Sequence, residues 1–198
     1  MKVICIGDSI TQGYGVPYKE NWVELLNENK GIEVINKGIN GDTSGGMLSR
    51  FYRDVVDEKP RFVIIMGGAN DFISGNTMGA VKSNIMAMVH QAYYNRLTPI
   101  LGISIKADIH NFREDWAKLT DVDHFNYKVL EYRKWILSFC NIFNVMYIDF
   151  CDEFENKIKG DYGNYLTDGL HPSKEGHQIL ADIAYEHINR LGIFKQTK

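Results

Sequence analysis

Val3-Ile4-Cys5-Ile6-Gly7-Asp8-Ser9 is a short apolar run that ends in a glycine and two polar residues. An apolar run without polar alternation is typical of a strand that is buried on both faces of a parallel sheet. The glycine at its end permits close approach of backbone or ligand. Four more runs that predict buried strands follow along the chain: Glu33–Asn36, Arg61–Met66, Pro99–Ile105 and Val145–Asp149.

Segments with helical periodicity lie between these runs. In residues 77–95, the apolar side chains form one stripe at i, i+4, i+7 and i+8, which is the pattern of an amphipathic helix. The helices predicted in this way span residues 22–29, 46–56, 77–95, 123–143 and 173–191. Buried strands that alternate with amphipathic helices predict an α/β fold, a three-layer α/β/α sandwich around a flavodoxin-like, five-stranded parallel sheet.

Length and composition set the outer limits of the interpretation. With 198 residues, 44% hydrophobic and 24% charged, the chain fits one domain over residues 1–198, without repeats or a linker. The net charge of −3 lacks the basic footprint of a nucleic-acid-binding protein. The longest run without polar side chains, Phe62–Ala69, is far shorter than the roughly 18 residues of a membrane span. Composition leaves the oligomeric state open.

The cysteines and the first residues indicate a cytoplasmic location. Cys5, Cys140 and Cys151 are odd in number, show no C-x-x-C spacing and have apolar neighbours, so we expect buried, reduced thiols. Met1 and Lys2 lead directly into the first strand, without the apolar segment and cleavage site of a signal peptide.

Ser9 follows the first predicted strand, at the sheet edge where ligands of such folds bind. A serine in this turn could act as a nucleophile, with the following backbone N–H groups stabilising an oxyanion. Two other interpretations are a turn serine with local hydrogen bonds, and a phosphate-binding nest in a non-catalytic flavodoxin-like module. The chain has neither the G-x-S-x-G nor the Walker A pattern of two rival classes.

Asp168 and His171 form a candidate pair of carboxylate and general base. Gly169 and Pro172 disfavour a continuous helix there, and a turn at Gly169 would fold the carboxylate back onto the imidazole. Ser173 is predicted to cap the last helix. The alternative is a capping aspartate beside a surface histidine.

Two further strand ends offer hydrogen-bond donors. Gly41 precedes a predicted helix, and its backbone N–H could stabilise developing negative charge. Asn70 offers a side-chain amide after the third strand. Each residue could equally be a simple turn former.

These four strand-end blocks together resemble the GDSL, or SGNH, hydrolase family. The resemblance rests on Gly7-Asp8-Ser9-Ile10, Ile39-Asn40-Gly41-Asp42-Thr43, Gly67-Gly68-Ala69-Asn70-Asp71 and Asp168-Gly169-Leu170-His171-Pro172. Ile10 stands where the family name has leucine. Residues 40–48 further resemble the bacterial thioesterase/lysophospholipase branch.

The resemblance implies an SGNH hydrolase fold and a serine ester hydrolase that forms an acyl-enzyme. By the same resemblance, Ser9 is the nucleophile, His171 the general base and Asp168 its orienting carboxylate. The amides of Ser9 and Gly41 and the side chain of Asn70 would then form the oxyanion hole. No metal or organic cofactor is implied, and the partner is a small acyl ester. Acyl thioesters, lysophospholipids and acetylated carbohydrates remain alternative substrates.

Several residues receive other expectations. Asp8, Asp42 and Asp71 are expected to brace loops rather than react. Specificity is expected in the loops 72–79 and 106–123, whose conformations a single sequence leaves open. We expect the rings of Tyr93, Tyr94, Trp116 and Trp135 to pack in the core or on the surface. The alternative is that they line an acyl or sugar pocket. The remaining histidines, at 90, 110, 124, 177 and 187, lack H-E-x-x-H spacing, so no zinc site is predicted.

Overall fold

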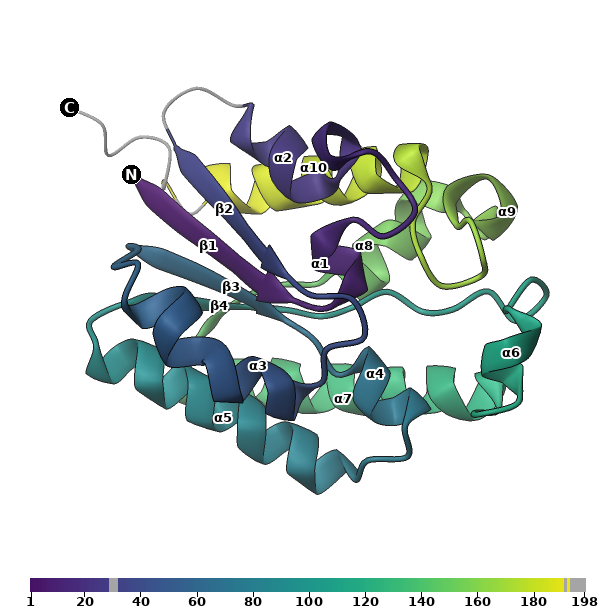
Figure 1. The fold of residues 1–198 in the computed structure, drawn as a ribbon, viewed down its shortest axis with the longest axis horizontal. Helices are drawn as coiled ribbons and strands as arrows, with labels where there is room; N and C mark the ends of the chain where they lie inside the picture. The colour runs from purple at the N-terminus through teal and green to yellow at the C-terminus, as the bar shows by residue number, and fades with distance from the viewer. Residues whose placement is uncertain (29–31, 191, 193–198) are drawn as a thin grey trace.

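Five parallel strands form one sheet in the order β2-β1-β3-β4-β5, in a computed structural model that describes residues 1–28, 32–190 and 192 (Figure 1). The strands are β1 (Lys2–Gly7), β2 (Glu33–Gly38), β3 (Phe62–Met66), β4 (Thr98–Gly102) and β5 (Met146–Ile148). The register places Gly7 between Gly38 and Met66, so three strands end side by side. The chain order reverses between β1 and β3, and such a switch point is where ligands bind in open α/β sheets. The predicted fold class is confirmed.

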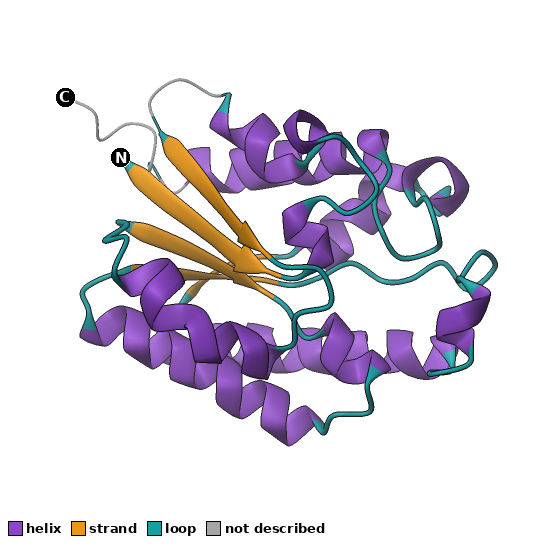
Figure 2. Cartoon of the chain, in the orientation of Figure 1, coloured by secondary structure: helices purple, strands orange, loops and turns teal. Residues whose placement is uncertain are grey.

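Helices cover both faces of the sheet (Figure 2). One face carries α1 (Ser9–Gln12), α2 (Trp22–Asn27), α8 (Phe150–Ile158), α9 (Tyr162–Tyr165) and α10 (Lys174–Arg190). The other carries α3 (Ser44–Phe51), α4 (Ala69–Ile73), α5 (Met78–Tyr94), α6 (Glu114–Ala117) and α7 (Val122–Phe143). A 3-10 turn, η1 (Tyr18–Glu20), precedes α2, and a π-helical turn, η2 (Tyr52–Val56), continues α3.

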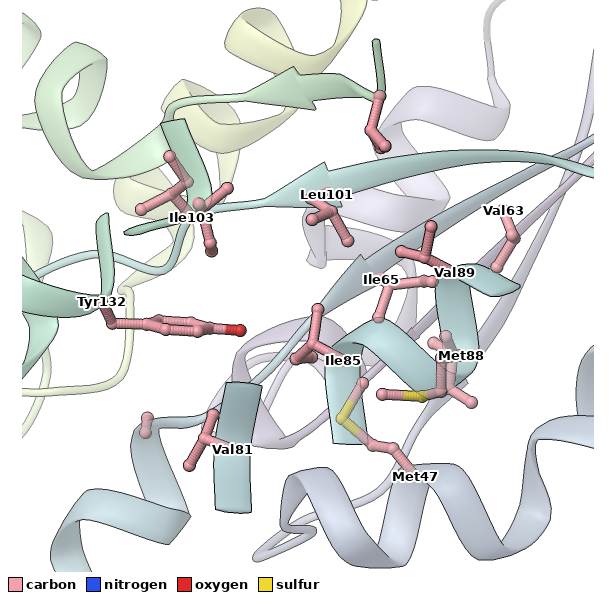
Figure 3. Packing of buried hydrophobic residues seen from close by; sticks show 14 of the residues in the cluster. Met47, Val63, Ile65, Val81, Ile85, Met88, Val89, Leu101, Ile103 and Tyr132 are labelled. Carbon is pink, nitrogen blue, oxygen red and sulfur yellow. The ribbon is translucent and has the colours of Figure 1, made fainter. Parts of the chain in front are cut away.

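Successive side chains of the strands enter two separate apolar clusters. Ile4 and Ile6 of β1 pack with α3, α5 and α7, whereas Val3 and Cys5 pack with α2, α8 and α10. Figure 3 shows the first cluster, where Ile65 of β3 and Leu101 of β4 face α5. Burial on both sides explains why the strands read as unbroken apolar runs.

The structure corrects some predicted boundaries. The fourth strand was expected at Pro99–Ile105 but ends at Gly102, because its neighbours β3 and β5 end at the residues that pair with Gly102. Helix α8 was not predicted, although Asp149 caps it and Phe150, Phe154 and Ile158 form its buried stripe. Asn29 and Leu191, the expected ends of two helices, lie outside the described residues.

The three cysteines, Cys5, Cys140 and Cys151, are buried free thiols, as expected. Burial raises the pKa of the Cys151 thiol to about 11, so it remains protonated at neutral pH. Within the described ranges, no helix combines the length and apolar character that crossing a membrane requires.

Candidate active site

Ser9 is held at the carboxyl end of β1 as the first residue of α1. Asp8 caps this short helix, because its Oδ1 accepts a hydrogen bond of 3.0 Å from the Ile10 backbone N–H. Gly13 ends the helix with a positive φ of 89°. The turn leaves Ser9 7% exposed, with its hydroxyl facing a cavity.

His171 reaches Ser9 from the other end of the chain. Gly169 adopts a φ of +80°, and a Cβ there would lie 2.6 Å from the Asn111 carbonyl oxygen, so only glycine fits this turn. The turn folds the Asp168 carboxylate back onto the imidazole, as the sequence predicts. Ser173 Oγ then accepts from the Gly176 backbone N–H at the start of α10, which confirms the predicted cap.

An uninterrupted chain of hydrogen bonds joins the three residues. His171 Nε2 lies 2.8 Å from Ser9 Oγ, and His171 Nδ1 lies 2.8 Å from Asp168 Oδ2. Burial disfavours the charged form of Asp168, but hydrogen bonds from the side chain and backbone of His171 outweigh it and lower its pKa to about 2. A histidine between a hydroxyl group and a fixed carboxylate can accept the hydroxyl proton and stabilise the resulting positive charge.

Gly41 and Asn70 line the same cavity as Ser9 and His171. Gly41 has a φ of +75° in the loop after β2, and Asn70 lies in the first turn of α4, after β3. Asn70 Nδ2 donates to the Asp42 carbonyl at 3.0 Å, which fixes the orientation of the amide. The structure therefore gathers all five predicted site residues at one edge of the sheet.

Arg50 binds the ends of β1 and β2 together from α3. Its guanidinium donates to the carbonyl oxygens of Gly7 (3.1 Å) and Lys37 (2.8 Å), and forms ion pairs with Asp42 (2.7 Å) and Asp54 (3.0 Å). The side chain is only 8% exposed. This residue was not predicted from the sequence, although an arginine on the apolar stripe of an amphipathic helix was a usable signal.

Asp71 braces the loop between Gly41 and α3. Its carboxylate accepts hydrogen bonds from the backbone N–H (2.7 Å) and the hydroxyl (2.8 Å) of Ser44. Asn84 of α5 donates to the same hydroxyl at 3.0 Å. Asp42 and Asp71 thus have the bracing contacts that the sequence analysis expected.

Asp8 differs from the other two aspartates. It is 1% exposed, and its Oδ2 has no hydrogen-bond partner among the described residues. Burial raises the pKa of Asp8 to about 6, with a further upward contribution from Asp42 and Asp71, while His171 opposes the shift. Folding therefore takes this carboxyl group from water without full compensation.

The cavity beside Ser9 is small, about 210 Å³. Its lining residues are Ser9, Tyr14, Asn40, Gly41, Asn70, Arg113, Trp116 and His171. The expectation for Trp116 was wrong in part: the ring lines this cavity besides packing on Phe112, because segment 106–123 returns across the site. Trp135 instead stacks between Tyr132 and Phe139 on α7, as expected.

The two loops expected to hold specificity differ. Segment 106–123 contributes Arg113 and Trp116 to the cavity. None of residues 72–79, all of which the structure describes, lines it, and Phe72 is buried in the core. Tyr14, Asn40 and Arg113 were not predicted as cavity residues. Asn40 directly precedes the predicted Gly41, whereas Arg113 is brought to the site only by the course of segment 106–123.

Metal coordination has no visible support in the described part of the chain. There, no group of three or more histidine, cysteine, aspartate or glutamate side chains lies together as ligands. His177, 0% exposed, accepts a hydrogen bond from the Trp22 backbone N–H at Nδ1. Burial lowers the pKa of His177 to about 4, so it is neutral at physiological pH and serves packing.

Comparison with known proteins finds similarity to esterases and to lipolytic proteins. The curated TesA esterase of Pseudomonas aeruginosa is 34% identical over 95 residues, 46% of this chain and about half (47%) of that protein's length. An acetylxylan esterase of Geobacillus stearothermophilus is 26% identical over 91% of this chain and 90% of its own. A crystal structure of a member of the lipolytic protein G-D-S-L family from Veillonella parvula superposes with a TM-score of 0.81, 25% identity and coverage of 96% and 99%.

The match to a protein-family model extends over nearly all the helices and strands of the structure. The model of the GDSL-like lipase/acylhydrolase family matches residues 5–179, from β1 to the second turn of α10. This range contains Ser9, Gly41, Asn70, Asp168 and His171. The chain therefore belongs to the GDSL-like lipase/acylhydrolase family.

Proposed function

We propose that this chain is a serine carboxylic-ester hydrolase that works through an acyl-enzyme. The observation that carries the proposal is the hydrogen-bond chain from Ser9 Oγ through His171 to Asp168 at the mouth of a cavity. The base, His171, lies 2.8 Å from the nucleophile Ser9 and 2.8 Å from the orienting carboxylate of Asp168, which is the geometry of nucleophilic acyl transfer.

In the acylation step, Ser9 Oγ attacks the ester carbonyl carbon while His171 Nε2 takes the hydroxyl proton. The tetrahedral intermediate collapses, the bond to the alcohol oxygen breaks, and His171 returns the proton to that oxygen. Asp168 remains ionised throughout, since its pKa is about 2, and stabilises the imidazolium.

The developing oxyanion needs donors that are already in place. We assign this role to the backbone N–H groups of Ser9 and Gly41 and to the Asn70 amide. The contact from Asn70 to the Asp42 carbonyl uses one of its two amide hydrogens and leaves the other to donate. In deacylation, His171 activates a water molecule that releases the acid from Ser9.

The size of the cavity favours a short acyl group. At about 210 Å³ it is smaller than the range of about 300–1,000 Å³ that ligand pockets usually occupy. Long-chain thioesters and lysophospholipids are therefore less favoured substrates than acetyl or propionyl esters.

The test compares hydrolysis of p-nitrophenyl esters from acetate to dodecanoate, and of acetyl and long-chain acyl thioesters. We expect kcat/KM to be highest for the shortest oxygen esters and Ser9→Ala to lower it by at least about 10⁴-fold. The exposed Ser49→Ala is the matched control and should retain full activity.

A fluorophosphonate probe gives the second readout. It should label the wild-type chain and the Ser49→Ala variant but not Ser9→Ala. If Ser9 is not labelled and the chain instead binds FMN or a phosphate ester tightly, the chain is a binding module and not a hydrolase.

A further inference from the structure

We infer that Trp116 and Arg113 select the alcohol portion of the ester, and that this portion is a sugar ring. The inference rests on the proposed function and assigns the part of the cavity that the chemistry itself does not use. Both residues lie in segment 106–123, far in sequence from Ser9 and His171, and both line the cavity beside them.

The place of the alcohol follows from the path of the proton. Because His171 returns a proton to the leaving oxygen, that oxygen must lie within hydrogen-bond reach of His171 Nε2. Two rings pack against the His171 imidazole: Tyr14, with centroids 4.5 Å apart, and Trp116, with centroids 5.1 Å apart. The group attached to the leaving oxygen therefore lies beside His171, on the side of the cavity where these two rings also lie.

Arg113 places a charged, polar group beside these two rings. Its guanidinium lies over the Trp116 ring, 4.6 Å from the centroid, and is held by two hydrogen bonds to Asp115, of 2.6 and 2.7 Å. Its backbone N–H donates to the Asp168 carbonyl at 3.2 Å, which ties the segment to the turn that carries His171. The Trp116 ring and the Arg113 guanidinium are thus positioned relative to the leaving group before substrate binds.

The side chains of Tyr14, Arg113 and Trp116 distinguish between classes of alcohol. An aromatic ring beside a guanidinium and the Tyr14 hydroxyl suits a pyranose, which has apolar faces and a rim of hydroxyl groups. A simple alkyl or aryl alcohol would contact the Trp116 ring but would make no use of these polar groups.

Three acetate esters provide the test, because all three form the same acetyl-enzyme. They are a monoacetylated methyl pyranoside, phenyl acetate and ethyl acetate, assayed with wild type, Trp116→Ala, Trp116→Phe and Arg113→Gln. Tyr94→Ala, an aromatic residue that is 90% exposed on α5, is the control. The measurements are kcat/KM for each ester and the rate at which acetyl-enzyme is hydrolysed in rapid-quench experiments.

We expect Trp116→Ala to lower kcat/KM for the sugar acetate by about tenfold or more relative to its effect on ethyl acetate. Trp116→Phe should recover part of this loss. Arg113→Gln should lower kcat/KM for the sugar acetate more than kcat/KM for phenyl acetate. Hydrolysis of the acetyl-enzyme should be unchanged, because the alcohol has already left.

Other outcomes overturn the inference. If Trp116→Ala lowers kcat/KM for all three esters in proportion and also slows hydrolysis of the acetyl-enzyme, Trp116 only positions His171. If phenyl acetate alone is affected, the alcohol is aromatic and not a sugar. If no acetyl-enzyme forms and the fluorophosphonate fails to label Ser9, the proposed function itself has failed, which the labelling readout separates from a wrong choice of alcohol.

Discussion

The loops after β1, β2 and β3 and the segment 106–123 both reach the cavity, but they are held in different ways. The three loops are joined by buried polar contacts around Arg50 and Asp71. Segment 106–123 crosses the site with Glu114, Asp115 and Lys118 exposed, and its ion pair between Arg113 and Asp115 is open to solvent.

This difference separates two requirements of an esterase. Oxyanion donors must not move when charge develops, so a buried network in which each charge has a partner suits them. A segment that selects among alcohols can be tied at a few points only. The comparison predicts large stability effects in the braced loops and small ones in segment 106–123.

Replacement of Arg50 should have the largest effect on stability. Arg50→Met leaves Asp42 and Asp54 without their shared cation, and breaking a buried ion pair in this way costs about 3–5 kcal/mol. Urea unfolding followed by circular dichroism measures the loss. The matched variant Arg113→Gln, on the exposed segment, should lose less than about 1 kcal/mol. Equal losses in the two variants would remove the distinction between the regions.

Asn70→Ala tests the chemical purpose of the braced loops. Loss of one oxyanion donor should lower kcat on p-nitrophenyl acetate by about 10²–10³-fold, with KM nearly unchanged. The control is Asn84→Ala, which loses a hydrogen bond to Ser44 but does not line the cavity. A kcat for Asn70→Ala within a factor of three of wild type would show that the amide is only a turn residue.

Asp8→Asn should have a smaller effect on stability, and the size of this effect should depend on pH. Since the folded pKa of about 6 lies above the ordinary value of 3.8, the folded state binds more protons between these values, and stability falls as pH rises through that window. At pH 8 the amide should therefore stabilise the fold by up to about 3 kcal/mol. At pH 4 the two proteins should have similar stability.

The control for this experiment is Asp121→Asn, because Asp121 also caps a helix but is exposed. Its stability should change by less than about 0.5 kcal/mol at either pH. Thermal unfolding of both variants at pH 4 and pH 8 gives the comparison. An Asp8→Asn variant that is less stable than wild type at pH 8 would contradict a carboxyl group that burial destabilises.

Most of the fold could be predicted because its signals are local. Apolar runs and helical stripes predicted all five strands and the helices α2, α3, α5, α7 and α10, while α8 was missed despite its cap and stripe. The positions of Ser9, Gly41 and Asn70 at the carboxyl edge of the sheet could be predicted, because each residue lies within a few positions of a strand end. Arg50, Tyr14 and Arg113 were not, since the contacts that bring them to the site, with Gly7, His171 and Asp168, are with residues distant in sequence.

The sequence by itself determined a parallel sheet and the residue types gathered at its carboxyl edge, because burial period and turn chemistry act over a few residues. Only the tertiary structure decided which side chains meet: that His171 Nε2 faces Ser9, that Arg50 joins two strand ends, and that Trp116 packs on His171. These contacts depend on how distant segments pack, and the free energy of packing is a property of the assembled core and not of any one segment.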